Sequence, residues 1–485
     1  MPLTTLKQHP LVQTLASLFE SMPRAEVFAV GGVVRNALLG RPFTDVDVII
    51  RGLPIDQVED VLKRLGRVDR VGKRFGVLKV WLAEGRELDV ALPRTDQSFR
   101  TGRYRDVAIT ADPDLPIEAD LARRDLTVNA IAWDIRKQRL VDPFGGQADL
   151  AQHLVRAVGD PRERFQEDAT RILRAVRFAV QLNFTIEPVT ADAMSEKLPL
   201  LNDQAITPRE VIAHELTRAF VANPVRAFDL WDDHGLFQTL IPEVTAMKGC
   251  AQPAEFHAEG DVWTHTRLAL MALTDPGFSQ TFPKATLTPQ LVVAVLLHDV
   301  GKPPTQKTPE RDHVDRIRFD RHAPVGAQLA DEIGQRLRLD AAGVDLDMIV
   351  WCIEHHLDIL NLDSIKPSTL EQTYLRPVRG PLLLQLTWAD SRASLGPDAV
   401  NAGRQFKEPK RFAQLRRQLA ELQAIGYEGQ RVKTLLSGDD IMRLLGIAGG
   451  PRIGQLLQEL RDAQLSGKVS TRAEAEAFVR KRHAH

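Results

Sequence analysis

The sequence predicts an α/β head with a small mixed sheet, followed by all-α regions, in an elongated multidomain chain. Strand-like runs are predicted in the first 150 residues: 27–30 and 46–50 are β-branched and apolar, 77–82 and 87–92 follow, and 140–141 adds a short one. Segments with helical periodicity follow almost without interruption, and they include 167–182, 208–220, 224–234 and 290–298. At 485 residues the chain is long enough for several cores.

Four regions follow from this pattern: a head at 1–150, a helical neck at 151–250, a second helical domain at 251–400 and a helical tail at 401–485. The loosest connections are predicted at 249–260 and 276–289, where turn-forming residues accumulate.

Composition limits the class of protein. Lys plus Arg number 63 against 64 for Asp plus Glu, so any nucleic-acid site must be a local basic patch. The two cysteines, Cys250 and Cys352, favour a reducing compartment over a disulfide framework. Neither a signal peptide nor a membrane-spanning run is expected, so we predict a cytoplasmic protein without a membrane partner, as a monomer or homodimer.

The first strand of the head leads into a glycine pair, Gly31 and Gly32, and then into a helix predicted at 33–39. Glycine lets the backbone approach phosphate oxygens, and a helix N-terminus favours an anion. The sequence therefore predicts a phosphate-binding turn at this point.

Two carboxylates, Asp45 and Asp47, belong to the next strand-like run. Residues two apart on a strand share a face, so their repulsion favours a cation between them. Oxygen ligands beside a triphosphate favour Mg²⁺. A solvated strand edge is the alternative, and it explains Asp89, a candidate third carboxylate, about as well.

The run Gly31-Gly32-x-x-Arg35-x-x-Leu38-Leu39-Gly40-x(4)-Asp45-x-Asp47 resembles the signature of the nucleotidyltransferase superfamily, within it the bacterial tRNA nucleotidyltransferase and poly(A) polymerase group. The resemblance implies attack by an RNA 3′-hydroxyl on the α-phosphate of a nucleotide, with Asp45, Asp47 and Asp89 at the catalytic metal and Gly31, Gly32 and Arg35 at the nucleotide. It also implies CTP and ATP as substrates and tRNA as the partner.

A basic segment at 94–116, with Arg94, Arg100, Arg103, Tyr104 and Arg105, shows little apolar periodicity. It is predicted to be a mobile loop, and an ordinary solvated surface loop is the alternative. In the resembling enzymes a flexible loop at this place helps the site to change nucleotide.

The segment Arg123-Arg124-Asp125-Leu126-Thr127-Val128-Asn129-Ala130 resembles the RRDxTxNA motif of the family. Forked guanidinium donors suit triphosphate oxygens, which gives Arg124 its expected role. Asp125 and Asn129, expected one helical turn apart, can hydrogen-bond a ribose.

The segment Glu167-Asp168-Ala169-Thr170-Arg171 resembles the EDxxR motif, and Arg174 follows on the same expected helix face. From spacing alone an intrahelical salt bridge between Asp168 and Arg171 is favoured. The resemblance implies instead that Asp168 and Arg171 read the Watson–Crick edge of CTP or ATP, because carboxylate and guanidinium can accept from and donate to the base.

A second constellation begins with His298-Asp299 after an apolar helix, and it includes His265, His322, Glu354-His355-His356-Leu357 and Asp390. It resembles the HD phosphohydrolase superfamily. The resemblance implies His265, His298, Asp299 and Asp390 as ligands of a metal. His322 and His356, rather than His355, would hold a second metal or orient phosphate, and Lys302 would contact phosphate.

Imidazole and carboxylate ligands suit Mn²⁺, Ni²⁺ or Co²⁺, and Mg²⁺ where carboxylates dominate. A metal-activated water attacking a phosphate ester is the implied reaction. The alternative is a degenerate domain kept as a scaffold or for RNA binding.

Beyond residue 396 the chain carries basic groups that form either a solvated helix face or a tRNA-binding patch: Arg404, Lys407, Lys410, Arg411, Arg416, Arg417, Arg431 and Lys433. The segments 437–442 and 449–457 resemble the tail of tRNA nucleotidyltransferases, which favours the patch.

The leading hypothesis is thus a CCA-adding tRNA nucleotidyltransferase with a fused phosphohydrolase domain. Three alternatives stay open from the motifs: a poly(A) polymerase, an enzyme that adds only the terminal A, and a phosphohydrolase whose head binds RNA without polymerising. The segment 71–76 partly matches the motif that marks poly(A) polymerases, but Arg70 and Gly76 depart from it.

Overall fold

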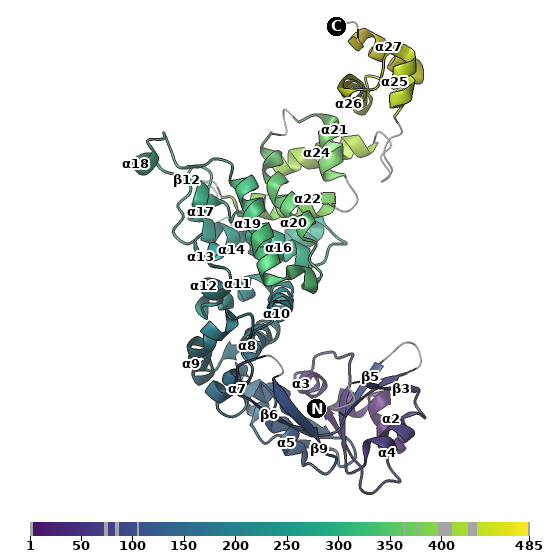
Figure 1. Ribbon diagram of the computed structural model, residues 1–485, viewed down its shortest axis with the longest axis vertical. Helices are drawn as coiled ribbons and strands as arrows, with labels where there is room; N and C mark the ends of the chain where they lie inside the picture. The colour runs from purple at the N-terminus through teal and green to yellow at the C-terminus, as the bar shows by residue number, and fades with distance from the viewer. Residues whose placement is uncertain are drawn as a thin grey trace. The chain divides into compact units, whose positions relative to one another are not determined.

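The computed structural model describes residues 3–71, 76–82, 87–103, 106–361, 365–375, 379–395, 410–424 and 434–483 (Figure 1). The chain forms two compact units, Met1–Ile241 and Pro242–His485. The first holds the predicted head and the predicted neck up to residue 241, and the second holds residues 242–250 and the remaining predicted regions. The borders near residues 150, 250 and 400 stay predictions.

The head is built on a seven-stranded mixed sheet in the order β3-β4-β5-β2-β1-β8-β9. The strands are β1 (Glu26–Val30), β2 (Asp47–Arg51), β3 (Arg67–Val71), β4 (Val77–Trp81), β5 (Glu87–Ala91), β8 (Ala132–Asp134) and β9 (Arg139–Val141). Neighbours are antiparallel except β2 and β5, which run in parallel. The sequence analysis missed β3, whose apolar residues are interrupted by charged ones, and β8, which has only three residues.

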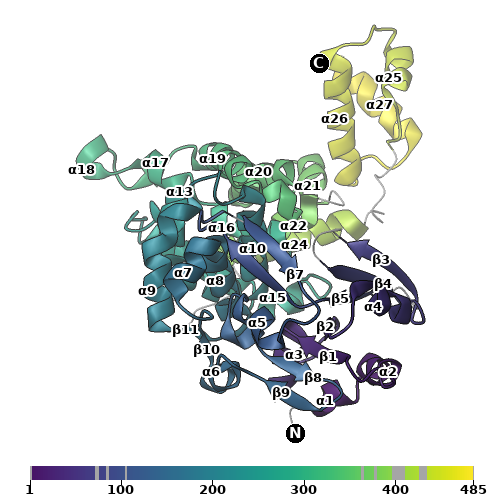
Figure 2. The ribbon, with the colours of Figure 1, turned by 60° about the horizontal axis from the view of Figure 1, so that its bottom comes forward.

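Both faces of the central strands are covered. Phe28, Val30 and Ile49 pack with Ile117 and Leu121 of α5 (Ile117–Ala122) on one face. On the other face Val27, Ala29, Val48 and Ile50 are also buried, which explains why these strands are continuous apolar runs. Figure 2 shows the head sheet beside its remaining helices, α1 (Thr4–Lys7), α2 (Pro10–Leu18), α3 (Gly32–Leu38) and α4 (Ile55–Leu62).

The segment predicted as a basic loop is largely a β-hairpin. β6 (Arg94–Ser98) pairs antiparallel with β7 (Val107–Ala111), outside the main sheet. β6 has the sequence Arg-Thr-Asp-Gln-Ser and lacked the apolar signal on which the prediction relied, whereas β7, with Val-Ala-Ile-Thr-Ala, carried a signal that the analysis passed over. Tyr104 and Arg105 lie outside the described residues, as do residues 72–75 of the segment 71–76.

The neck is helical, as predicted, except for a short parallel pair of strands, β10 (Leu154–Val155) and β11 (Thr185–Ile186). A 3-10 turn, η2 (Thr127–Asn129), precedes it, and a second, η3 (Leu198–Leu201), lies within it. Its helices are α6 (Gly146–Gln152), α7 (Pro161–Glu167), α8 (Thr170–Leu182), α9 (Pro188–Lys197), α10 (Arg209–Ala222), α11 (Pro224–Asp233) and α12 (Leu236–Leu240).

The second unit is also helical, with a small ribbon of β12 (Gln306–Lys307) and β13 (Arg318–Phe319). Its helices before residue 400 are α13 (Pro242–Thr245), α14 (Val262–Ala272), α15 (Pro276–Thr281), α16 (Pro289–Leu297), α17 (Lys302–Thr305), α18 (Pro309–Asp312), α19 (His322–Leu337), α20 (Leu346–His355), α21 (Pro367–Tyr374) and α22 (Arg379–Ala393), with 3-10 turns η4 (Leu339–Ala342) and η5 (His356–Asn361). The predicted loop at 276–289 is therefore wrong in its first half, where Asp275 caps α15.

Beyond residue 400 the described helices are α24 (Lys410–Ala424), α25 (Gly438–Leu445), α26 (Pro451–Leu465) and α27 (Arg472–His483). The last three share a small core that includes Ile441, Leu456 and Val479. Of the predicted basic patch, Arg404, Lys407, Arg431 and Lys433 lie outside the described residues. Among the helices that the structure describes, none has the length and apolar character needed to cross a bilayer.

Candidate functional site

Asp47 and Asp89 stand side by side in the head sheet. They occupy paired positions on the parallel strands β2 and β5. β2 begins at Asp47, so Asp45 precedes the strand instead of belonging to it as expected, but it lies near enough for its charge to act on Asp47. Burial raises the pKa of Asp47, Arg124 opposes the shift, and the negative charges of Asp89 and Asp45 reinforce it. Three carboxylates in mutual repulsion fit a divalent cation with oxygen ligands.

Gly31 adopts φ = 72° immediately before α3. A Cβ at this position would lie 3.1 Å from Arg124 Nη1 and 3.7 Å from Asp47 Oδ2. The glycine therefore provides the space in which a guanidinium and a carboxylate approach the start of the helix. The same helix carries Arg35, whose Nη1 donates to Asn129 Oδ1 at 2.6 Å.

The two arginines of the RRD segment are held by Asp120, which sequence reasoning missed. Asp120 is fully buried on α5. Its Oδ1 accepts from Arg123 at 2.8 Å, and its Oδ2 accepts from Arg124 Nη2 at 3.3 Å. The spacing of three and four residues was a readable signal, since it places the three side chains on one side of the segment.

Asp125 connects the head to the neck. It is buried, and Arg174 of α8 donates to its Oδ2 at 2.7 Å. Burial alone would raise the pKa of Asp125, but the charge and hydrogen bond of Arg174 outweigh it and lower that pKa. Asn129 reaches Asp125 at 3.5 Å across the 3-10 turn η2, not along the α-helical turn that we expected.

Asp168 does not lie on a helix with Arg171, which corrects the expected shared face. α7 ends at Glu167, Asp168 is extended with φ = −154°, and α8 begins at Thr170. Asp168 Oδ1 accepts from Thr170 N at 2.9 Å, whereas Arg171 Nη1 donates to Glu167 Oε2 at 2.7 Å. The ion pair between Asp168 and Arg171 that spacing alone favoured is not formed, since each side chain has a separate partner. Burial raises the pKa of Asp168.

The second unit gathers the predicted histidines and aspartates. His265 of α14, His298 at the end of α16 and Asp299 form one close group of ligand atoms. His265 Nε2 lies 3.1 Å from Asp390 Oδ1 of α22 and 3.6 Å from Asp299 Oδ2. His298 Nε2 lies 3.2 Å from Asp299 Oδ2.

Asp299 also belongs to a neighbouring group, with His322 and His356. Its Oδ1 lies 3.6 Å from His322 Nε2 and 3.8 Å from His356 Nε2. His355 instead stacks on Trp351 with ring centroids 4.4 Å apart. The structure thus brings together the six predicted metal ligands of this unit and leaves out His355, as expected from the resemblance.

Several observations fit a metal ion in this cluster. His322 Nε2 is buried without a hydrogen-bond partner, as is Asp299 Oδ2. Lys302 Nζ lies 2.7 Å from Asp299 Oδ2, in an ion pair that is not aligned as a hydrogen bond, and Nζ donates to Gln252 Oε1. Two carboxylates and four imidazoles are a donor set for a divalent transition metal. The tight groups of ligand atoms among the described residues all lie in this unit.

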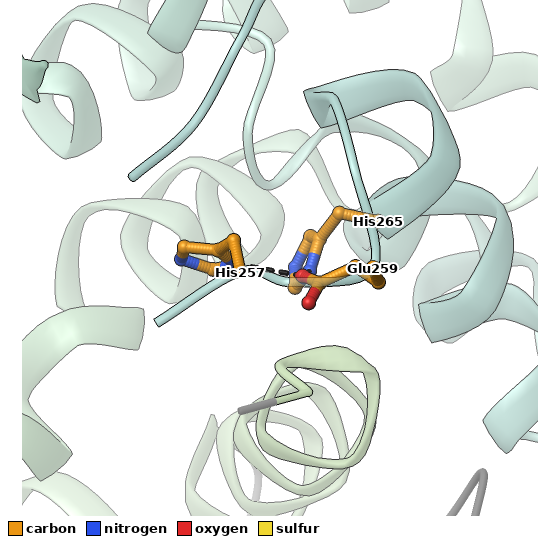
Figure 3. A group of neighbouring side chains, drawn as sticks. All are labelled: His257, Glu259 and His265. Carbon is orange, nitrogen blue, oxygen red and sulfur yellow. Dashed lines mark hydrogen bonds and ion pairs between the residues drawn. The ribbon is translucent and has the colours of Figure 1, made fainter. Parts of the chain in front are cut away.

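Glu259 was missed by sequence reasoning because it lies in the loop before α14, outside any motif that we used. Its Oε1 lies 2.7 Å from His257 Nδ1 and 2.9 Å from His265 Nδ1. Figure 3 shows the three side chains together. Burial would raise the pKa of Glu259, but the hydrogen bonds of both histidines lower it to about 2.

Three protein families match successive parts of the chain, in the same order as the predicted head, neck and second helical domain. Residues 27–156 match the "Poly A polymerase head domain" and residues 283–387 match the "HD domain". Residues 183–248 match the family described as "Probable RNA and SrmB- binding site of polymerase A".

Similar proteins cover most of the chain. The multifunctional CCA protein of Nitrosomonas eutropha is 32% identical over 374 residues, which are 75% of this chain and 83% of that protein. The CCA-adding enzyme of Bacillus stearothermophilus in complex with CTP is 22% identical, with a TM-score of 0.63 over 98% of both chains. The Thermotoga maritima CCA-adding enzyme complexed with tRNA is 20% identical, with a TM-score of 0.59 over 98% of this chain and 95% of that one.

The structural likeness confirms the fold class, a mixed-sheet head followed by helical domains. The curated relative decides the family, since it is nearly one-third identical across most of its own length. Together with the head and HD matches, this likeness shows that the chain belongs to the multifunctional CCA protein family, the CCA-adding tRNA nucleotidyltransferases that carry a fused HD domain.

Proposed function

We propose that this protein adds CCA to the 3′ end of tRNA, taking the nucleotides from CTP and ATP. The observation that carries the proposal is the pairing of Asp47 with Asp89 beside Gly31 and Arg124, which places carboxylates next to an anion-binding helix start. Membership of the multifunctional CCA family supports it, and similar structures contain CTP, ATP or tRNA.

In the proposed reaction the 3′-hydroxyl of the RNA attacks the α-phosphate, and pyrophosphate leaves. Asp47 and Asp89, with Asp45, would hold Mg²⁺, which neutralises charge on the attacking and leaving oxygens. The backbone at Gly31 and Gly32 and the guanidinium of Arg124 face the triphosphate. Arg35 and Asn129, joined by a hydrogen bond, are positioned with Asp125 for the ribose.

Nucleotide choice is assigned to Asp168 and Arg171, with Arg174 beside them. Because Asp168 is extended between two helices, its second carboxylate oxygen is directed independently of the Arg171 side chain. Arg171 is held by Glu167 and Arg174 by Asp125. Two separately anchored groups can present an acceptor and a donor to the amino and ring positions of cytosine or adenine.

The test is to incubate the purified protein with Mg²⁺, CTP and ATP on tRNAs that lack CCA, end in C or end in CC, and to sequence the products. Complete CCA on all three ends is expected. Addition of A only to the CC end would make the protein an A-adding enzyme, and long A tails would make it a poly(A) polymerase. No extension would leave the HD domain as the main activity.

A second activity is favoured by the histidine cluster: metal-dependent hydrolysis of a phosphoester. His265, His298, Asp299 and Asp390 would hold a divalent ion such as Mn²⁺, Ni²⁺, Co²⁺ or Mg²⁺, which would activate a water. His322 and His356 share Asp299 with this group, and Lys302 carries the positive charge for a phosphate. Hydrolysis of a 2′,3′-cyclic nucleotide that is lost in His298→Ala is the expected result, whereas unchanged hydrolysis would refute this site.

The cytoplasmic location and the monomeric or homodimeric state stay predictions. So does tRNA binding by the tail, where Arg416 and Arg417 belong to the described helix α24.

A further inference from the structure

We propose that Glu259 is a positioning residue of the HD site, which turns the His265 imidazole so that its Nε2 faces the metal ion. The inference rests on the proposed phosphoesterase function. Glu259 lies in the loop before α14 and does not contact the ion itself. Its role accounts for the buried carboxylate in that loop.

The other three histidines of the cluster are oriented by hydrogen bonds to the backbone. Each Nδ1 lies close to the carbonyl oxygen three residues earlier: His298 at 2.8 Å from Val295 O, His322 at 3.0 Å from Phe319 O and His356 at 2.5 Å from Ile353 O. A carbonyl oxygen only accepts, so each Nδ1 must be the donor. The neutral ring then offers Nε2 as the acceptor for a metal.

His265 does not form such a hydrogen bond to the backbone. It lies in the second turn of α14, whereas His298 and His356 follow the last residues of their helices and His322 begins one. Carbonyl oxygens near a helix C-terminus lack intrahelical partners, but those around His265 are already engaged. Val262 O, three residues earlier, accepts from the Thr266 hydroxyl at 2.9 Å. A side-chain acceptor must therefore replace the carbonyl.

Glu259 supplies that acceptor. Its side chain is 1% exposed, and its Oε1 lies 2.9 Å from His265 Nδ1. An ionised carboxylate only accepts, so His265 Nδ1 donates and Nε2 is left for the ion. Nε2 points to the opposite side, 3.1 Å from Asp390 Oδ1 and 3.4 Å from His298 Nε2.

The same carboxylate also fixes the end of the segment that carries Asp390. Glu259 Oε2 accepts from Leu395 N at 2.8 Å, five residues beyond Asp390, and Leu395 O accepts from Ala258 N at 2.8 Å. Glu259 is thus hydrogen-bonded both to His265 and to the backbone that follows Asp390. Losing it would release the imidazole and the end of this segment together.

An alternative is that His257, Glu259 and His265 hold a metal themselves, since their ligand atoms also lie close together. The geometry favours the positioning role. Oε1 is already shared by two imidazole Nδ1 atoms, whereas the Nε2 side of His265 collects two carboxylates and another imidazole Nε2.

The test is Co²⁺ binding to the full chain after chelator treatment, measured by equilibrium dialysis. The His298→Ala chain gives the Co²⁺ bound outside the HD site, which is subtracted. Glu259→Ala is expected to weaken the remaining binding by ~10–100-fold, the usual effect of losing a group that orients a ligand. Glu259→Gln is expected to weaken binding less than Glu259→Ala does, because the amide oxygen can still accept one of the hydrogen bonds. It should still bind more weakly than the wild type, because the carboxylate has two acceptor oxygens and the amide has one.

Two controls separate this role from others. Glu255→Gln removes an exposed carboxylate from the same loop, and His257→Gln removes the other histidine on Glu259. Both should bind Co²⁺ like the wild type. Loss of total Co²⁺ binding in His257→Gln, before the subtraction, would place the metal at the alternative group and overturn the proposal, as would wild-type affinity in either Glu259 variant.

Thermal unfolding establishes that each variant is folded, and Glu259→Gln keeps the test valid if the alanine variant does not fold. Should the wild type bind no more Co²⁺ than His298→Ala, the proposed phosphoesterase site fails, and the role of Glu259 fails with it. Binding in the wild type that is unaffected by the Glu259 variants refutes the positioning role alone.

Discussion

Asp47 on β2 and Asp89 on β5 face each other across a parallel strand pair. In parallel strands, paired residues extend to the same face of the sheet, so residues 42 positions apart in the sequence bring two carboxylates together. Both side chains are exposed, but Lys79 lies 3.5 Å from Asp89, whereas Asp47 has its pKa raised by desolvation and by the neighbouring carboxylates. The two ligands are therefore chemically unequal.

Asp47→Asn should abolish nucleotide addition while leaving the chain folded. The amide keeps the volume of the side chain but removes the charge that would hold the ion, which costs several kcal/mol of transition-state stabilisation, or on the order of a thousandfold in rate. Asp69→Asn, on β3 of the same sheet, is the matched control and should keep full activity. CTP incorporation into a tRNA that lacks CCA is the measurement, and near wild-type turnover of Asp47→Asn would refute the metal assignment.

Gly31→Ala should reduce nucleotide addition through contact with the site. A Cβ would crowd Arg124 Nη1 at 3.1 Å, and the positive φ adds strain of about 1–3 kcal/mol. Gly40→Ala, after the other end of α3, is the matched control, because its φ is also positive but no atom lies within 4 Å of the added carbon. Both variants should unfold at lower temperature, and only Gly31→Ala should lose incorporation. Equal activity of the two would show that the glycine is needed for the turn alone.

The central strands of the head could be predicted because both of their faces are buried. β1 then appears as an uninterrupted apolar run and β2 as one broken by Asp47, and the prediction placed the ends of both strands within one residue of those observed. β3, with the sequence Arg-Val-Asp-Arg-Val, is half exposed and gives no such signal. Its place in the sheet is decided by pairing with the next strand, β4, a contact that the β3 segment alone does not reveal.

The break at Asp168 could not be predicted from periodicity. Asp168 and Thr170 are weak helix formers, but neither glycine nor proline marks the junction. The chain is turned by tertiary contacts: Asp168 caps the new helix through Thr170, and Ala169 N donates to Gly102 O of the hairpin region. Such a cap favours the break only once the surrounding chain is in place.

The metal ligands of the HD site could be predicted because they belong to the family motif. The groups that orient those ligands could not be predicted, because they lie outside the motif. The i−3 carbonyls that hold three of the histidines follow from helix ends, which became visible only in the structure. Glu259 acts from an irregular loop that we had read as a loose connection.

Asp168→Asn should impair addition of both C and A. An amide can still accept from Thr170 N through its oxygen, which preserves the cap, but its NH₂ group presents a donor where the proposed base contact needs an acceptor. Losing one hydrogen bond to a charged group, about 1.5–3 kcal/mol, predicts a decrease of roughly 10- to 100-fold in kcat/KM for CTP and ATP. Asp192→Asn, exposed on α9, is the control. An unchanged kcat/KM for both nucleotides would remove Asp168 from base recognition.

The adjacent residues His355 and His356 allow a sharp test of the HD site. His356 is 1% exposed, directs Nε2 at Asp299 and has its pKa lowered to about 4 by burial, so it is neutral and able to accept a metal at pH 7. His355 lies outside the cluster, stacked on Trp351. His356→Ala should therefore lower hydrolysis of a 2′,3′-cyclic nucleotide by more than ~100-fold, beyond the usual effect of losing a group that only orients a ligand.

His355→Ala should keep hydrolysis within about twofold of the wild type, a change of less than about 0.5 kcal/mol. Chelation should abolish hydrolysis in the wild type, and Mn²⁺, Ni²⁺ or Co²⁺ should restore it there but not in His356→Ala. CCA addition, assayed in Mg²⁺, should be unaffected by either histidine variant, since the head lies in the other unit. If His355→Ala proves to be the inactive variant, hydrolysis depends on His355 and not on His356. The assignment of Asp299, His322 and His356 as a ligand group would then be wrong.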